Sequence, residues 1–267
     1  MTRLCLLLPL FFLGCTKKEA YYNQLALVNG QLMVLITTIP IDQSDTENGR
    51  ISIRSKSGNL VEVGRFDEGF KVGKWRYYPV GSRKEEFDWA VYRDTVKHIA
   101  INYPSDWEVK TGDNAKQLFY ATFEPRSPFT HDKLFGVLAQ NKDAGVTLED
   151  YWLYYCSVAF KEDVQEYASY KIKTESGKEF YLVRFIIKRN GEEVLQFGFV
   201  GEMDGKFYEI LYSSLNEEYK RKHILFFDAI RSMTVGDARF FSPLEPIKFI
   251  TPLKRPNFEG KPDPDLS

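Results

Sequence analysis

Three glycine-containing turns between alternating apolar segments constrain the fold of this chain more than any other feature. Ser176-Gly177, Asn190-Gly191 and Asp204-Gly205 separate four segments that read "EYASYKIKTE", "EFYLVRFIIK", "EVLQFGFVGE" and "FYEILYSSL". Asn-Gly and Asp-Gly between such segments are strong signals of a β-hairpin, because glycine adopts the positive φ that tight hairpin turns need. This part of the chain therefore predicts four consecutive antiparallel strands.

Two amphipathic segments flank these strands and predict helices. In "TLEDYWLYYCSVAFKE" (147–162), Thr147 can cap the helix and the first turn is acidic. Tyr154 should be partly exposed or covered by another segment, since the aromatic residues at 151–155 wrap around the helix and exceed what one face can bury. The second segment is "NEEYKRKHILFFDAIRSM" (216–233), with Asn216 as a plausible cap. Helical spacing groups the following apolar-face residues: Leu148, Tyr151, Trp152, Tyr155 and Ala159 in the first helix; Tyr219, His223, Phe226, Phe227 and Ile230 in the second.

Three further strands precede the first helix, in segments 96–109, 116–125 and 132–142, and the first of these segments has a turn at Pro104-Ser105-Asp106 before Trp107. The order β-β-β-α-β-β-β-β-α over residues 91–236 predicts an α+β fold in which two helices flank one antiparallel sheet. That order, with the motifs "INYPSDWEV" and "FFDAIRSM", resembles the PsbP-like family. This α/β/α sandwich is shared by the photosystem II extrinsic subunit P, a Ran-binding protein of the Mog type and bacterial envelope lipoproteins. The resemblance implies a non-enzymatic binding or assembly module and supplies no catalytic residue.

A glycine-rich region at residues 46–90 predicts a small β-meander. Segments 49–55 and 60–66 alternate around the turn "KSGN", and Gly64, Gly69 and Gly73 precede an aromatic cluster beginning at Trp75. Glycine suits tight turns and the close approach of strands. The stretch resembles a single bacterial MORN-type repeat. Because one repeat cannot bury its own face, Trp75 should be buried against the rest of the chain.

The N-terminal segment resembles a lipoprotein signal. Arg3 precedes an apolar run from Leu4 to Leu13, which is too short to cross a bilayer and ends in "FFLGC". Gly14-Cys15 resembles the lipobox of bacterial lipoproteins, which implies cleavage after residue 14 and lipidation of Cys15; a simple secretory signal that is cut elsewhere is the alternative. Cys5 lies within the signal, so Cys156 alone would remain and no disulfide is expected in the mature chain.

The expected organisation follows from these segments. Residues 1–14 form the signal peptide, and residues 15–45 form a lead-in and linker in which "QLMVLITTIPI" (31–41) is either one strand or a buried connector. Residues 46–90 are the MORN-like region, and 91–236 the PsbP-like domain. The tail at 237–267 holds six of the twelve prolines and should be extended rather than helical.

The sequence shows no recognisable catalytic, cofactor or metal motif. His98, His131 and His223 lack metal-ligand spacing, with His98 in a predicted strand. Cys156 lies among tyrosines in a predicted helix, which favours a packed thiol over a nucleophile. We therefore expect no catalytic residue, no cofactor and no metal.

The leading hypothesis is a non-catalytic envelope lipoprotein. It would be anchored through Cys15, in the outer membrane of a Gram-negative cell, and would bind a protein or lipid partner. The net charge of −1 argues against a nucleic-acid partner. Two alternatives stay open, a hydrolase with an unrecognised carboxylate pair and an immunity-type protein that blocks a toxin. A polar cleft with facing carboxylates would favour the hydrolase, and a broad apolar groove would favour the binding protein.

Overall fold

The computed structural model describes most of the chain from residue 19 onward. The described residues are 19–28, 31–40, 48–55, 57–78, 84–112, 119–126, 132–160, 163–189, 191–240 and 247–257, with side chains described outside 19–40, 119, 132–135 and 216–223. The predicted signal peptide at residues 1–14 and the predicted lipidation site Cys15 lie outside this part of the chain.

The described strands form two antiparallel sheets. The first sheet has nine strands, in the order β1 (Glu19–Val28), β2 (Gln31–Pro40), β3 (Gly49–Ser55), β4 (Leu60–Asp67), β5 (Phe70–Tyr77), β6 (Glu85–Asp94), β7 (Ile99–Pro104), β15 (Thr234–Val235) and β16 (Ala238–Arg239). The second sheet has eight strands, in the order β17 (Ile247–Leu253), β11 (Val164–Thr174), β12 (Glu179–Arg189), β13 (Glu192–Met203), β14 (Lys206–Leu215), β10 (Asp132–Asn141), β9 (Phe119–Pro125) and β8 (Trp107–Gly112).

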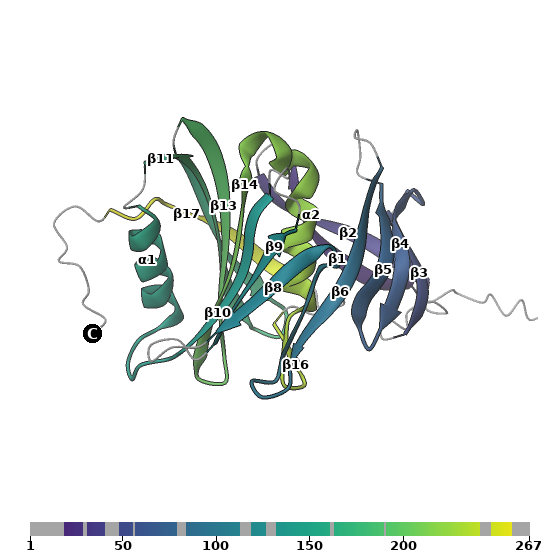
Figure 1. Ribbon diagram of the computed structural model, residues 1–267, viewed down its shortest axis with the longest axis horizontal. Helices are drawn as coiled ribbons and strands as arrows, with labels where there is room; N and C mark the ends of the chain where they lie inside the picture. The colour runs from purple at the N-terminus through teal and green to yellow at the C-terminus, as the bar shows by residue number, and fades with distance from the viewer. Residues whose placement is uncertain are drawn as a thin grey trace, which may run out of the picture.

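The two described helices occupy different layers (Figure 1). Helix α1 (Leu148–Ala159) covers the outer face of the second sheet, and α2 (Asn216–Ser232) contacts β7 of the first sheet and β13 and β14 of the second. One hydrophobic cluster joins the inner faces of both sheets to α2, and a second lies beneath α1. The molecule is therefore mostly antiparallel β-structure with one helix enclosed between the sheets.

The hairpin prediction is confirmed. Strands β11 to β14 are consecutive and antiparallel, and Gly177, Gly191 and Gly205 all have positive φ. Helix α1 begins as predicted, because Thr147 accepts a hydrogen bond from the Asp150 backbone and Asp150 bonds back to the Thr147 amide. Tyr154 is half-buried, as expected from its place beside the buried face of α1.

The prediction of one sheet over residues 91–236 is wrong in one respect. β7 pairs with β6 and β15 in the first sheet, whereas β8 to β14 lie in the second. The chain changes sheet at the turn after Pro104, so Trp107 begins a separate strand, β8. α2 consequently packs between two sheets instead of flanking one. Strand β6 spans residue 90 and pairs with both β5 and β7, so backbone hydrogen bonds continue from the MORN-like region into the next segment.

Several local predictions also need correction. His98 lies in a turn with φ 55° and is exposed, not in a strand. The N-cap of α2 is Leu215, one residue before Asn216, and makes no side-chain capping bond. Residues 31–40 form strand β2, so the strand interpretation of segment 31–41 is correct and the buried-connector interpretation is wrong. Strand β2 pairs with β1, which the sequence analysis did not predict. The tail adds a strand, β17, to the edge of the second sheet beside β11.

The glycines of the MORN-like region serve backbone geometry, as predicted. A Cβ at Gly64 would lie 2.2 Å from the Trp75 ring, so glycine is required for β4 and the indole to lie in contact. Gly69 and Gly73 have φ values of 76° and 61°, which L-residues rarely adopt. Trp75 is fully buried in the cluster that joins the two sheets, and its Nε1 donates to the carbonyl of Arg65 at 3.0 Å. The region therefore shares its core with the rest of the chain.

Candidate functional site

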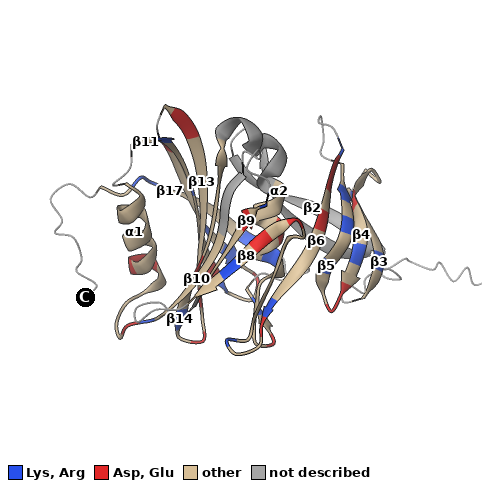
Figure 2. Cartoon of the chain, in the orientation of Figure 1, with Lys and Arg blue, Asp and Glu red and all other residues tan. Residues whose placement is uncertain are grey.

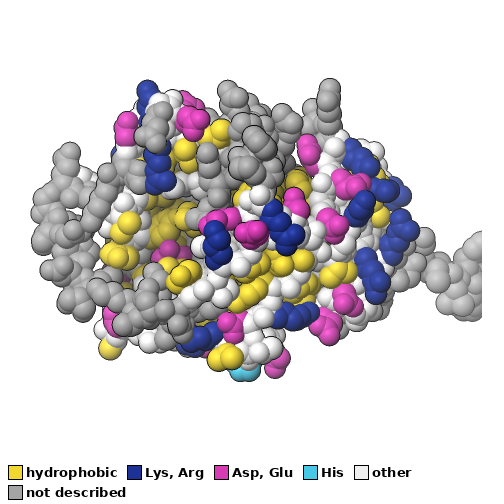
Figure 3. Space-filling view, in the orientation of Figure 1, with side chains coloured by type: hydrophobic (Ala, Val, Ile, Leu, Met, Phe, Trp, Pro, Cys, Tyr) yellow, Lys and Arg dark blue, Asp and Glu magenta, His cyan; other side chains and the backbone are white. Residues whose placement is uncertain are grey.

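The outer face of the second sheet carries an open groove of about 260 Å³ beside α1. Its floor comes from β9, β10 and β14, whose cross-strand pairs align Tyr120 with Leu138 and Glu209, and Thr122 with Gly136 and Leu211. The exposed lining is mostly apolar. Figure 3 shows hydrophobic side chains gathered in the hollow between α1 and this sheet. Volume and lining suit a small ligand with a large apolar part.

Helix α1 lies beside the groove, and three of its aromatic residues rest on the sheet. Tyr151 stacks on Phe207 of β14 with ring centres 4.3 Å apart, and Trp152 stacks on Tyr181 of β12 at 5.0 Å. Tyr155 lies over Gly198 of β13, where a Cβ would be 2.3 Å from its hydroxyl oxygen. The predicted apolar face of α1 thus fixes the helix close to the sheet.

Glu209 is the carboxylate on the groove floor. It accepts a hydrogen bond of 2.5 Å from the Tyr151 hydroxyl, which joins the floor to α1. Burial raises the pKa of Glu209, while the Tyr151 hydrogen bond opposes the shift. Within the described ranges, no lysine or arginine forms an ion pair with this carboxylate. The groove thus combines an apolar surface with one incompletely compensated acidic group.

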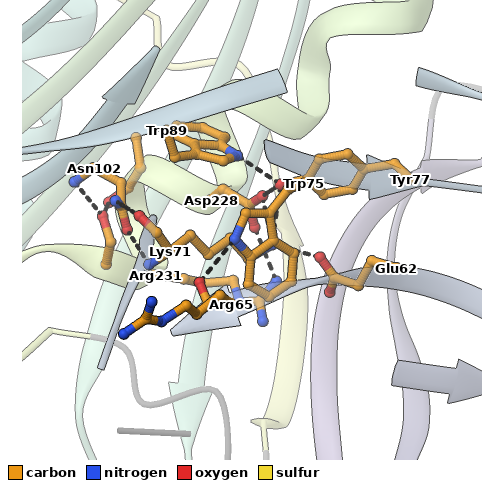
Figure 4. Close-up of polar contacts among 11 residues, drawn as sticks. Glu62, Arg65, Lys71, Trp75, Tyr77, Trp89, Asn102, Asp228 and Arg231 are labelled. Carbon is orange, nitrogen blue, oxygen red and sulfur yellow. Dashed lines mark hydrogen bonds and ion pairs between the residues drawn. The ribbon is translucent and has the colours of Figure 1, made fainter. Parts of the chain in front are cut away.

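A second polar cluster lies inside the molecule, between β4, β5 and α2 (Figure 4). Lys71 Nζ bonds to Glu62 and to Asp228 Oδ2, the latter at 2.7 Å. Tyr77 donates to the same Asp228 oxygen at 2.6 Å, and Arg231 Nη1 donates to Asp228 Oδ1 at 3.2 Å. All four charged side chains are at most 5% exposed, so two anions and two cations are enclosed together.

Neighbouring groups hold the cluster in place. Trp89 Nε1 donates to the Tyr77 hydroxyl at 2.8 Å. The Asn102 side chain accepts a hydrogen bond from the Lys71 backbone N–H and donates one to the Lys71 carbonyl. The backbone N–H of Asn102 donates to Ser232 Oγ of α2 at 2.8 Å. The Lys71 ammonium also lies 4.3 Å from the centre of the Trp75 ring, within the range of a cation–π contact. These contacts tie β5, β7 and α2 into one unit.

The charged side chains of this cluster are too deeply buried to contact a substrate in the described structure. Burial raises the pKa of Glu62 to about 7, with Lys71 opposing the shift and Asp228 adding to it. A cavity lined by Trp89 and Asn102 of this cluster, with Trp107 among others, has room for about one water molecule. Glu62 and Asp228 share one lysine, so they do not face each other across a cleft as a hydrolytic carboxylate pair must.

The remaining candidate residues of the sequence do not meet in the described structure. Cys156 is buried in α1, and burial raises the pKa of its thiol to about 12, consistent with a packed thiol. His131 and the His223 side chain lie outside the described set. No group of three or more His, Cys, Asp or Glu side chains in the described ranges is arranged to hold a metal ion. Among the described helices, none has the length and apolar character needed to cross a membrane.

Charge is distributed unevenly despite the small net value. Arg50 and Arg65 lie directly opposite each other on the exposed face of β3 and β4, and Arg76 follows on β5 (Figure 2). Arg76 pairs with Glu86 at 3.2 Å, which compensates part of this positive charge. These residues lie on the first sheet, and the groove lies on the second.

Comparisons with known proteins give a distant structural similarity and no family assignment. No family model and no curated protein matches the sequence. The chain is similar in structure to cyanobacterial PsbP (CyanoP) from Synechocystis sp. PCC 6803, with 16% identity and a TM-score of 0.42 over 59% of this chain and 99% of that chain. It is also similar to PA94, a protein of unknown function from Pseudomonas aeruginosa, with 10% identity and a TM-score of 0.31 over 51% and 88% of the two chains. Both TM-scores are low, so the proposals below rest on the site itself. The resemblance of residues 46–90 to a MORN-type repeat is not tested by these comparisons.

Proposed function

We propose that this chain is a non-catalytic binding protein of the bacterial cell envelope, anchored to the outer membrane by a lipid on Cys15. Its binding site is the groove beside α1, which takes the apolar part of a lipid-like or protein partner. The observation that carries the proposal is the mostly apolar groove floor on β9, β10 and β14, left open next to helix α1, which covers a neighbouring part of that face. Open apolar surface in a folded chain commonly marks a binding site.

The arrangement of carboxylates favours binding over hydrolysis. Glu62 and Asp228 are enclosed and neutralised by Lys71, and the groove presents one carboxylate, Glu209. General acid–base hydrolysis by a carboxylate pair needs two such groups reaching one substrate. No observation in the described residues favours the immunity-type alternative over a general binding role.

Gly136 provides a direct test of the groove. A Cβ at this position would lie 3.7 Å from its nearest neighbour, and its φ is not in the positive range, so the backbone there accepts a residue with a Cβ. Gly136→Val should fill the groove floor while the fold remains intact. We expect binding of Nile red, a neutral apolar dye, to fall at least tenfold in this variant, measured by fluorescence titration.

Ser52→Val is the matched control, because it places the same side chain on the outer face of β3 in the other sheet. It should leave dye affinity unchanged. Equal dye binding by the wild type and Gly136→Val, with both variants folded by circular dichroism, would refute the groove as the binding site.

The anchor is tested separately in cells. Wild type should incorporate a labelled fatty acid and sediment with membranes, and Cys15→Ala should lose both properties. Equal labelling of both proteins would exclude Cys15 as the lipidation site without affecting the proposal for the groove.

A further inference from the structure

Glu209 is the feature of the groove that an apolar ligand alone does not explain. Its carboxylate lies on a floor built from Leu138, Leu211 and the backbone of β10, where burial disfavours its charged form. A buried charge is normally paired with an opposite charge or fully hydrogen-bonded. The described contacts of Glu209 amount to one hydrogen bond, from the neutral hydroxyl of Tyr151.

An aromatic ring lies in the same cross-strand row as this carboxylate. Tyr120 on β9 pairs with Leu138 on β10, and Leu138 pairs with Glu209 on β14, so the three side chains share one face of the sheet. The row therefore presents an aromatic ring, an apolar side chain and a carboxylate in sequence. The Tyr120 ring lies over Gly112 of β8, on the side of the row away from Glu209, so Glu209 is the group of this row that can pair with an ammonium ion.

The size and charge of the groove restrict the ligand further. About 260 Å³ is at the small end of ligand pockets, which suits a short alkyl chain better than a large molecule. A carboxylate or phosphate head group would meet Glu209 with like charge, and a neutral molecule would leave this carboxylate uncompensated.

We infer, on the basis of the proposed function, that the groove binds a small amphiphile with a protonated amine at one end and an alkyl chain at the other. The ammonium group pairs with Glu209, and the alkyl chain covers Leu138, Gly136 and Leu211. Pairing with the cation offsets the desolvation of the carboxylate, and the apolar chain displaces water from the floor.

Three probes of equal chain length separate the contributions of charge and apolar contact. Hexylammonium, hexanol and hexanoate compete with Nile red for the full-length protein at neutral pH. We expect hexylammonium to compete at least tenfold more strongly than hexanol, and hexanoate more weakly than hexanol. Glu209→Gln should make hexylammonium and hexanol equivalent while hexanol affinity is retained.

Glu202→Gln is the matched control. Glu202 also lies on the second sheet, on the neighbouring strand β13, but it pairs with Lys142 at 2.7 Å and does not line the groove. This variant should keep the preference for the ammonium probe. Equal binding of hexanol and hexylammonium by the wild type, or a preference that survives Glu209→Gln, would overturn the inference and leave the proposed function standing. If Gly136→Val binds the dye as well as the wild type does, and none of the three probes displaces the dye, both the inference and the proposed function would be overturned.

Discussion

Lys71 holds together two buried carboxylates that belong to distant parts of the chain. Its Nζ reaches Glu62 on β4 and Asp228 on α2, and all three side chains are almost completely buried. Lys71→Met keeps most of the side-chain volume and removes the cation, which leaves Glu62 without its partner. Breaking a buried ion pair in this way costs about 3–5 kcal/mol, so we expect a loss of that order in the free energy of unfolding, measured in urea.

The variant Glu62→Gln/Lys71→Met is the control for this prediction. It removes the uncompensated anion as well, so the double variant should be more stable than Lys71→Met alone. A Lys71→Met protein as stable as the wild type would show that the cluster does not contribute to folding.

The pH dependence of stability should report on Glu62. Because burial raises the folded-state pKa of Glu62 to about 7 from 4.5, the folded protein holds this proton more tightly than the unfolded chain. The contribution of Glu62 to stability is therefore fully present below pH 4.5 and is lost as the pH rises through 7. Subtracting the unfolding free energy of Glu62→Gln from that of the wild type at each pH isolates this contribution. A difference that stays constant or increases from pH 4.5 to 8 would contradict the assignment.

The sequence contains signals for these buried charges, but they are visible only with the fold in hand. Glu62 has the same strand parity as the buried Phe66, and Asp228 interrupts the apolar run "ILFFDAI". Either residue alone is compatible with a solvated position. Their meeting depends on a contact between residues 62 and 228 that no local pattern encodes. The same holds for Glu209. Its spacing of two residues from Phe207 and Leu211 places all three side chains on one face of β14, but it does not show which part of that face α1 leaves open.

At the scale of elements, the contact between β4 and β5 depends on the absence of a side chain at Gly64. A Cβ there would lie 2.2 Å from the Trp75 indole, and that ring is enclosed by its neighbours. Gly64→Ala should therefore destabilise the protein by about 1–3 kcal/mol through overpacking, measured by chemical denaturation. In a Trp75→Leu background the same change should cost clearly less, because the smaller side chain can move aside.

Gly136→Ala is the matched control for Gly64→Ala. The added Cβ meets nothing closer than 3.7 Å, so this change in a strand should be neutral or slightly stabilising. Equal effects of the two substitutions would show that the indole contact is not the cause.

Elements with strong local signals could be predicted from the sequence, and their partners could not. The turns at Gly177, Gly191 and Gly205 predict β11 to β14 correctly, and the capping residue Thr147 with the acidic first turn predicts the start of α1 correctly. The prolines of the tail predict extended structure but give no sign that residues 247–253, which include Pro252, pair with a sheet. Proline is tolerated at a sheet edge, and β17 is the edge strand beside β11. Strands β15 and β16 have two residues each, too few to produce a pattern.

At the scale of the whole molecule, the division into two sheets follows from contacts that are distant in sequence. The alternation of apolar and polar residues in segment 96–109 predicts extended structure, but it does not indicate that the chain moves from one sheet to the other after Pro104. The enclosure of α2 had a clearer signal. Residues 224–232 of this helix are all buried, and the four consecutive apolar residues from Ile224 to Phe227 extend beyond one helix face, which is typical of an interior helix segment. The MORN-like region could be expected to share a core with the rest of the chain on grounds of size alone, and it does so through Trp75 and Tyr77.

The proposal that the groove beside α1 binds an amphiphile is tested most directly by locating the bound molecule. Backbone amide chemical shifts of the isotope-labelled full-length protein should be recorded with increasing hexylammonium. The account predicts the largest changes at residues 120–122, 136–138 and 209–211, smaller changes in α1, and unchanged signals from β3 to β5. The changes should disappear in Gly136→Val. Saturable changes that cluster on another surface, or that persist when Gly136→Val fills the groove, would contradict it.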